Sequence, residues 1–186
     1  MVMPHDSGDR PFATEEEAKA LASAVRIRIL RLCLDTALTN KQIAQRMEMN
    51  PATVLHHVRK LVATDFLAAE PARTGARGAK EIPYRATGRS WRIRLEPQFH
   101  STLSKVMVAA FIAEFPEEPE PSTFMRRLGV RLTDAEYTEL CDRLSNVLAE
   151  YVNRTSSSEP DAKPYSIFTT VHSDNGRERS LPGDTE

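Results

Sequence analysis

The sequence predicts a mainly α fold with a small β component (α+β). Three observations support this prediction. Amphipathic segments with helix-starting residues follow one another between residues 14 and 64, two extended segments flank a glycine-containing basic turn, and two longer helical segments come after them. At 186 residues the chain can form one domain with extensions or two small domains, and it can bury a core without disulfides.

Three of the predicted helices begin at side chains that can cap them. Thr14 precedes a run of three glutamates, whose negative charge suits the first turn of a helix. Thr39 stands three residues before Gln42, which is the spacing of a capping box. Asn50 precedes a proline, and a proline at the first helical position needs no backbone N–H. A further helical run, SAVRIRILRLCLD, lies between the first two of these helices.

A basic hairpin is predicted after residue 65, where the apolar spacing changes from helical to extended. FLAAEPAR and EIPYRAT flank TGARGAK, which has two glycines and, with the adjoining Arg73, three cations. Residues 50–94 carry 9 basic and 3 acidic residues, net +6, although the whole chain has a net charge of −1. A local excess of positive charge of this kind suits contact with a phosphate backbone.

Two longer helices are predicted in the C-terminal half. The segment FHSTLSKVMVAAFIAEF, residues 99–115, is apolar nearly all round, which favours burial between subunits. The proline-rich segment 116–121 ends it. Thr133 and Glu136 form a capping box for a helix that runs to about residue 153. YSIFTTV, residues 165–171, is rich in β-branched and aromatic residues and predicts one strand.

The order helix, helix, short helix, turn, helix, basic hairpin is that of a winged helix-turn-helix. ALASAVRIRIL, LTNKQIAQRMEMNPATVLHHVRKLVATDFL and the wing through IPYRAT resemble the ArsR-like family of bacterial transcriptional regulators, in its actinobacterial type with a C-terminal extension. The resemblance covers roughly residues 14–95. It implies a homodimer formed through residues 14–22 and 99–115, and repression in preference to activation.

This interpretation divides the chain into a disordered lead, a winged helix-turn-helix DNA-binding domain, a helical region for dimerisation and effector binding, and a disordered tail (residues 1–13, 14–95, 96–172 and 173–186). The expected function is sequence-specific binding to double-stranded DNA. Residues 51–64 would lie in the major groove of each half of an inverted-repeat operator, with the wing, residues 73–80, on the backbone or minor groove. The alternative is a ligand-sensing or protein-interaction module that uses the winged helix as a docking scaffold.

The candidate DNA contacts lie on the predicted recognition helix, in the segments before it and on the wing. In the recognition helix an apolar stripe faces inward, while Thr53, His56 and Lys60 face outward as candidates for reading the groove. His57 lies at the edge of the stripe, where packing in the core and a phosphate contact are both open. The full set is Thr39, Asn40, Asn50, Ala52, Thr53, His56, His57, Arg59, Lys60, Arg73, Arg77, Lys80 and Arg85.

A metal site on the adjacent histidines, His56 and His57, is disfavoured by helical geometry. Neighbouring residues on a helix point about 100° apart, whereas metal-ligand pairs stand at i and i+4. Metal sensors of the family carry a Cys-x-Cys motif that corresponds here to Thr39 and Lys41, so that site is missing. The alternative is a site elsewhere that uses His100 and His172 with acidic residues. We expect no metal and no cofactor.

Other features of the sequence bound the class of protein. The two cysteines, Cys33 and Cys141, lie far apart in apolar helical patterns, which favours reduced core residues and a cytoplasmic location. No run approaches the roughly 18 apolar residues of a membrane span, and no secretory signal is visible. No motif of a serine hydrolase, a phosphate-binding loop or a metalloprotease occurs, so an enzyme is not expected.

The apolar surface of the C-terminal half admits two interpretations. The simpler is a larger dimer interface. The other is a pocket for a small apolar effector that would bias the dimer between states able and unable to bind DNA. Its expected lining is Met107, Phe111, Phe115 and Phe168.

Overall fold

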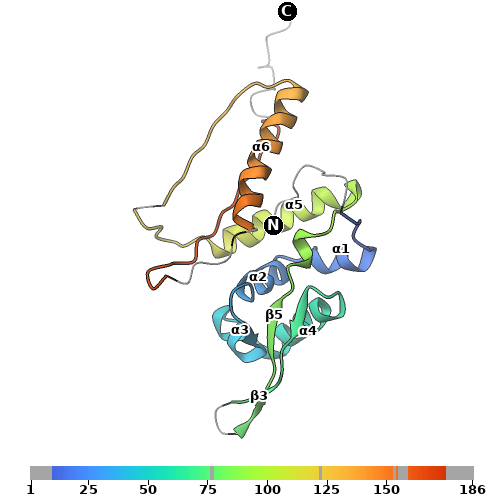
Figure 1. The fold of residues 1–186 in the computed structure, drawn as a ribbon, viewed down its shortest axis with the longest axis vertical. Helices are drawn as coiled ribbons and strands as arrows, with labels where there is room; N and C mark the ends of the chain where they lie inside the picture. Colours follow the sequence, from blue (N-terminus) through green and yellow to red (C-terminus); the bar gives the residue numbers. More distant parts are fainter. Residues whose placement is uncertain (1–9, 76–77, 122, 153, 155–158, 175–186) are drawn as a thin grey trace, which may run out of the picture. The chain divides into compact units, whose positions relative to one another are not determined.

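The computed structural model describes residues 10–75, 78–121, 123–152, 154 and 159–174. The chain divides into two compact units, one ending at Glu117 and one beginning at Glu118. The expected fold class is confirmed, because helices dominate and the strands form small antiparallel sheets (Figure 1). The elements of the first unit are α1 (Glu15–Leu21), α2 (Ala24–Leu32), β1 (Leu38–Thr39), α3 (Asn40–Arg46), α4 (Pro51–Ala63), β2 (Leu67–Ala69), β3 (Arg73–Thr74), β4 (Lys80–Glu81), β5 (Pro83–Ala86), η2 (Arg89–Trp91) and α5 (Pro97–Glu114).

The expected helix starts are confirmed. Thr39 and Gln42 form a reciprocal capping box at α3, with each side chain bonded to the other's backbone N–H. The Asn50 side-chain oxygen accepts a hydrogen bond from Ala52 N at 2.8 Å, which caps α4. Thr14 caps α1 with a capping box of its own, whose acidic member is the third glutamate of the run.

The predicted apolar stripe of α4 forms part of the core. Val54, Val58 and Leu61 are all 0% exposed, and α4 packs against α3 and α2. Full burial of one such side chain contributes about 1.5–3 kcal/mol relative to leaving it in water. This burial fixes the rotation of α4 about its axis and therefore decides which of its residues face outward.

Both helices of the helix-turn-helix end in a left-handed residue that is not glycine. Glu48 follows α3 with φ 54°, and Asp65 follows α4 with φ 56°. Each turn is closed by an amide that donates back to the last helical turn, Met49 N to Ala44 O (2.9 Å) and Phe66 N to Leu61 O (2.9 Å). This geometry makes the chain turn sharply between α3 and α4, and again between α4 and the wing.

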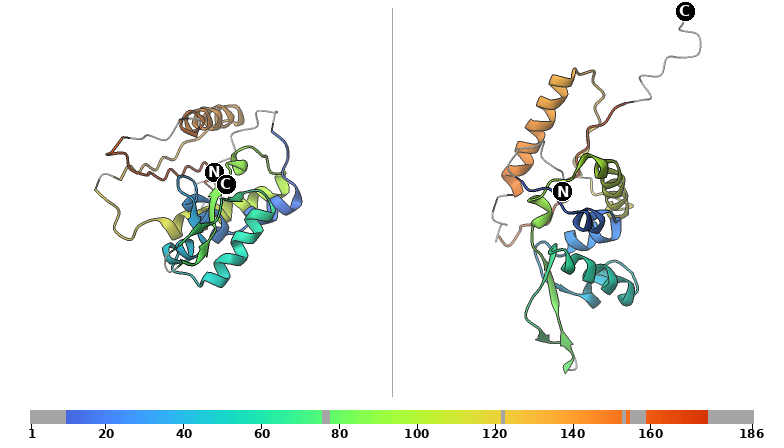
Figure 2. Two further views of the ribbon diagram at one scale, coloured as in Figure 1. Left: turned by 60° about the horizontal axis from the view of Figure 1, so that its bottom comes forward. Right: turned by 90° about the vertical axis from the view of Figure 1, so that its right-hand side faces the viewer.

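The wing is built from two short antiparallel ladders. β5 lies between β1 and β2 in a three-stranded sheet, and Leu67 is opposite Ala86. β3 and β4 form a separate two-stranded hairpin with Arg73 opposite Glu81. The hairpin projects beyond the helices of the first unit, as the right-hand view of Figure 2 also shows (Figures 1 and 2).

Residues 10–13, which we expected to belong to a disordered lead, are bonded to the segment after the wing. Ala13 N donates to Arg94 O at 2.7 Å, and Arg94 N donates to Pro11 O at 2.9 Å. The Arg94 guanidinium also lies 4.1 Å from the centre of the Phe12 ring. The composition of residues 10–13 does not indicate a defined conformation, because the bonds that hold them join backbone groups far apart in the sequence.

α5 covers α2, and Leu103 and Ala110 of α5 are buried. Arg31 of α2 and Glu114 of α5 form an ion pair at 2.7 Å. The apolar surface of α5 is wider than α2 can cover, because Val108 and Ile112 stay exposed. The nearly all-round apolarity of this helix is therefore not matched by burial within one chain.

The second unit contains α6 (Asp134–Val152), which begins at the predicted capping box of Thr133 and Glu136. The predicted strand at 165–171 is wrong, because the described residues 159–174 include no strand. A strand needs an edge to pair with, and β propensity alone supplies none. Tyr165 and Ile167 are instead exposed.

In the described parts of the chain, no helix has both the length and the apolar character needed to cross a membrane.

Candidate nucleic-acid interface

The outer face of α4 gathers most of the residues expected to contact DNA. Thr53, His56, Arg59 and Lys60 are exposed on the side of α4 opposite the buried stripe, and Ala52 is exposed at its first turn. Helical spacing of three and four residues places Thr53, His56 and Lys60 in one row. The row offers a hydroxyl, an imidazole and an ammonium group, all able to bond to base edges or phosphates.

The start of α4 is held by side chains that the sequence suggested as DNA contacts. Asn40 Nδ2 donates to Pro51 O at 2.9 Å, which ties the first residue of α3 to the first residue of α4. Asn50 uses its side-chain oxygen as the cap. Thr39 is buried, and its hydroxyl oxygen accepts a hydrogen bond from Gln42 N. These three residues position the start of α4, and the Thr39 side chain is buried and therefore not accessible to a ligand on the surface.

His57 is half-buried and differs from its neighbour His56. Its Nδ1 lies 3.5 Å from Nη1 of Arg26, and the two imidazole rings are 5.7 Å apart at an interplanar angle of 72°. Burial, together with the positive charge of Arg26, lowers the pKa of His57. The neutral ring can accept from Arg26 at Nδ1 and keep an N–H on Nε2 as a donor.

Arg26 is a buried cation that joins three helices. Its Nε donates to Ala20 O at 2.5 Å and its Nη2 donates to Lys19 O at 2.7 Å, at the C-terminal end of α1. Cations suit that end of a helix because its carbonyl groups carry partial negative charge. Burial lowers the pKa of Arg26, but an arginine stays protonated at neutral pH. Arg26, itself on α2, therefore links the end of α1 to His57 on α4.

The wing supplies a second group of exposed cations. Arg73 and Lys80 are exposed on the two strands of the hairpin. An Arg73 nitrogen lies 3.4 Å from Gln42 Oε1 and another lies 3.8 Å from a Glu81 oxygen, so the base of the wing contacts α3. Arg77, the candidate at the tip, lies outside the described residues.

The positive charge counted over residues 50–94 does not form one surface. Arg85 Nε bonds to Glu70 at 2.5 Å, and Arg85 Nη1 donates to Asp35 O at 2.9 Å. Arg89 and Arg94 are likewise bonded to groups outside the α4 face. Arg85, which the sequence placed among the DNA contacts, is thus held by an ion pair. The described cations on the outer face of α4 and on the hairpin are Arg59, Lys60, Arg73 and Lys80.

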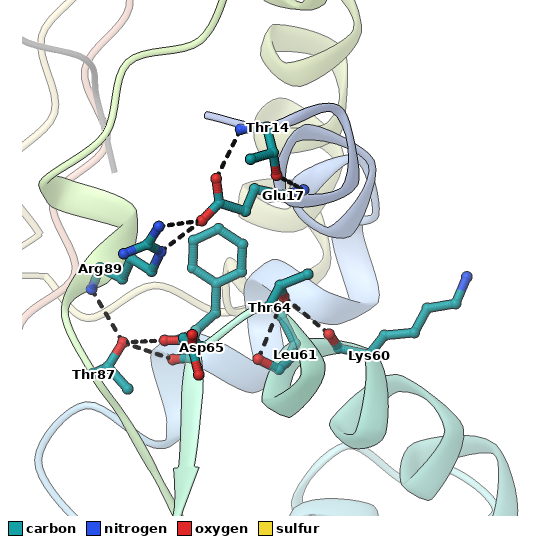
Figure 3. A network of polar contacts seen from close by, with 9 residues as sticks. Thr14, Glu17, Lys60, Leu61, Thr64, Asp65, Thr87 and Arg89 are labelled. Atoms are coloured by element: carbon teal, nitrogen blue, oxygen red, sulfur yellow. Dashed lines mark hydrogen bonds and ion pairs between the residues drawn. The ribbon is translucent and has the colours of Figure 1, made fainter. Parts of the chain in front are cut away.

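A polar network at the base of the wing joins α1 to the end of α4 (Figure 3). The Glu17 carboxylate is buried and accepts hydrogen bonds from Thr14 N (2.8 Å) and Arg89 Nε (2.6 Å). Arg89 N donates to Thr87 Oγ1, which in turn donates to Asp65 O at 2.6 Å. Burial opposes ionisation of Glu17, but the hydrogen bonds and the Arg89 charge outweigh it and lower the pKa of this carboxyl.

Sequence reasoning missed the roles of Glu17, Arg26 and Arg89. The spacing from Thr14 to Glu17 is that of a capping box and could have marked Glu17 as more than a charge in the first turn. No local signal marks Arg26 or Arg89, because their partners lie on other elements. Glu17 and Arg89, for example, are 72 residues apart.

The residues suggested for an effector site fall in different units. Met107, Phe111 and Phe115 are half-buried on and just after α5, and the rings of Phe111 and Phe115 are 5.3 Å apart. Phe168 belongs to the second unit. Within the described residues, no group of three or more His, Cys, Asp or Glu side chains is placed to hold a metal ion.

Residues 21–69 match a family described as a helix-turn-helix domain, a match that runs from the end of α1 to β2. No curated protein matches the chain. Among similar solved structures, reduced HlyU of Vibrio cholerae has 17% identity, with 50% of this chain and 81% of that chain covered and a TM-score of 0.31. A mutant of Lactococcus lactis ZitR in apo form has 20% identity, 72% and 86% coverage, and a TM-score of 0.33. Bacillus subtilis PadR in complex with operator DNA has 15% identity, 74% and 82% coverage, and a TM-score of 0.33.

Proposed function

We propose that this chain is a homodimeric, cytoplasmic, sequence-specific DNA-binding transcription regulator that acts as a repressor. The observation that carries the proposal is the outer face of α4, where Thr53, His56 and Lys60 form one exposed row on the side opposite the buried Val54, Val58 and Leu61. A helix presented in this way fits the width of a DNA major groove.

The expected roles of the wing and the dimer agree with this arrangement. Arg73 and Lys80 stand on a hairpin that projects past the helices, where they would neutralise phosphates beside the groove. Val108 and Ile112 stay exposed on α5, and a second copy packed there would cover them. Two copies related by a two-fold axis would bind an inverted-repeat operator and occlude a promoter.

Selection of bound genomic fragments, followed by affinity measurements on the selected duplex, tests this function. Lys60→Ala should cost about 1–3 kcal/mol on that duplex and relax the base preference at one position. Arg73→Ala/Lys80→Ala should weaken binding to all duplexes alike and reduce the salt slope by about 0.9 for each phosphate that is no longer neutralised. Arg85→Ala is the matched control, because this arginine is already held by Glu70.

Two outcomes would contradict the proposal. If no genomic fragment is enriched, the chain does not bind DNA in a sequence-specific way. If Lys60→Ala lowers the affinity for the selected duplex and for random duplexes equally, Lys60 does not read a base.

A further inference from the structure

The second compact unit has no core of its own. None of its described residues between 118 and 174 is buried. Its described helix, α6, has an apolar stripe that includes Leu140, Leu144 and Leu148, yet Tyr151 at the end of the stripe is 56% exposed. An isolated helix of this length is marginal in water unless its apolar face is packed. The described residues of this unit therefore do not supply the surface that the apolar stripe of α6 needs.

The segment before α6 is a second exposed apolar surface. Every described residue from 123 to 139 is exposed. Phe124 and Leu128 are 81% and 82% exposed, and Val130 and Leu132 are also exposed. Leu128, Val130 and Leu132 alternate along the sequence, so they share one side of the segment when it is extended. A soluble chain rarely leaves two such apolar surfaces uncovered.

The two surfaces carry opposite charges. Residues 123–132 contain three arginines, Arg126, Arg127 and Arg131, and no acidic residue. α6 contains five acidic residues and one basic residue, a net charge of −4. The apolar residues of both surfaces are thus accompanied by charges that attract one another. Charge complementarity of this kind gives an interface its register and its choice of partner.

The lengths of the two surfaces match, but their connection within one chain is unfavourable. Ten extended residues span about 33 Å, and the 19 residues of α6 span about 28 Å. Thr133 alone separates the segment from α6, and its capping bonds with Glu136 fix the start of the helix. To lie along its own helix, the segment would have to reverse direction within that one residue, whereas connections between elements ordinarily take two or more.

We propose that residues 123–132 of one copy of this chain pack along α6 of a second copy, and that the second copy returns the same contact. Two-fold symmetry makes both contacts identical, so the second unit acquires its core only in the dimer. The inference deepens the proposed homodimer and rests on that part of the proposed function. It adds an exchanged C-terminal contact to the expected interface at residues 14–22 and 99–115.

A charge-exchange experiment on the full chain tests this contact. Variant A carries Arg127→Glu and Arg131→Glu in the segment. Variant B carries Glu139→Lys and Glu150→Lys, two exposed residues on one side of α6. In A alone and in B alone, like charges face each other at both contacts. In a mixture, A meets B with opposite charges at both contacts.

Hydrogen exchange of the α6 amides is the readout, because it reports on this unit whether or not the protein binds DNA. We expect protection of residues 134–152 to fall by about tenfold or more in A and in B, and to return when the two are mixed and allowed to exchange subunits. Lys41→Glu/Lys163→Glu makes the same charge change as A at two exposed lysines that lie outside both expected dimer contacts, and it should leave that protection unchanged.

Two results would overturn the inference. If α6 is as protected in A alone and in B alone as in the wild type, the segment does not contact α6. If mixing A and B does not restore the protection, but a single chain that carries all four substitutions is protected, the contact lies within a chain. DNA affinity of the same variants, measured separately, reports on the proposed function alone.

Discussion

Replacement of Glu17 by glutamine tests the polar network that joins α1 to the base of the wing. The carboxylate is buried, and it accepts from Thr14 N and from two nitrogens of Arg89. Glutamine keeps the shape of the side chain but has one acceptor oxygen and no charge. Glu17→Gln must therefore give up either the cap of α1 or bonds to Arg89.

The expected cost follows from these contacts. A hydrogen bond to a charged group contributes about 1.5–3 kcal/mol net, and loss of a helix cap costs about 1 kcal/mol. The Arg89 side chain is 43% exposed, so water screens part of its attraction to Glu17. We therefore expect Glu17→Gln to lower the free energy of unfolding by about 2 kcal/mol. For a unit of about 100 residues this corresponds to a fall of about 8–16 °C in Tm.

Thermal and urea unfolding at one fixed protein concentration measure this effect, because dimerisation makes stability depend on concentration. Glu16→Gln is the matched control, since Glu16 is exposed in the same helical turn, and it should change stability by less than about 0.5 kcal/mol. Equal stabilities of the Glu16→Gln and Glu17→Gln variants at pH 7 would refute the network.

The pH dependence of the same pair gives a second check. The pKa of Glu17 is lowered in the folded state, so its contribution is fully present above the unfolded pKa, near 4.5. That contribution is lost as the pH falls through the lower folded value. The stability gap between wild type and Glu17→Gln should therefore close in acid, and a gap that stays constant down to about pH 2 would contradict a role for the carboxylate charge.

Four further predictions concern single residues. Gly88 has φ 74° and nothing within 4 Å of an added Cβ, so Gly88→Ala should cost about 1–2 kcal/mol through backbone strain alone. Glu48→Gly, at φ 54°, should instead stabilise by about 0.5 kcal/mol, and urea unfolding that gave both changes the same sign would contradict the left-handed turns. Burial and the Arg26 charge lower the pKa of His57, so below about pH 6.5 the unfolded chain takes up this proton before the folded chain does and stability falls. His57→Gln should flatten the stability profile between about pH 7 and 5, and an unchanged profile would count against the burial of this ring. Burial raises the pKa of Cys33 to about 11, so a thiol reagent at about pH 8 should label Cys33 only after unfolding, and equal labelling rates in folded and unfolded protein would show that it is accessible.

Local signals in the sequence were enough to predict the helices and the outward-facing row of α4. The capping side chains Thr39, Asn50 and Thr133 mark helix starts because each bonds to backbone N–H groups two or three residues away. The outer row of α4 was also predictable, since the spacing of its apolar residues fixes which face is buried. The same reasoning separated His56, which is exposed, from His57, which is half-buried.

Features that depend on distant partners were not predictable. Counting charges over residues 50–94 treated Arg85 and Arg89 as part of a DNA-binding surface, whereas each is paired with a carboxylate that the count could not place. The strand expected at 165–171 failed for the same reason, because composition describes a segment and not the edge it needs. Two partners of Arg26 are backbone carbonyl groups, which leave no mark in the sequence.

The salt dependence of binding to a random-sequence duplex tests the central claim most directly. Two copies that each present Arg59, Lys60, Arg73 and Lys80 should bind duplex DNA at low salt, with a slope of log K against log salt between about −4 and −7. Arg73→Ala/Lys80→Ala should flatten that slope. Absence of binding to any duplex at low salt, or a slope near zero, would contradict DNA binding through α4 and the wing.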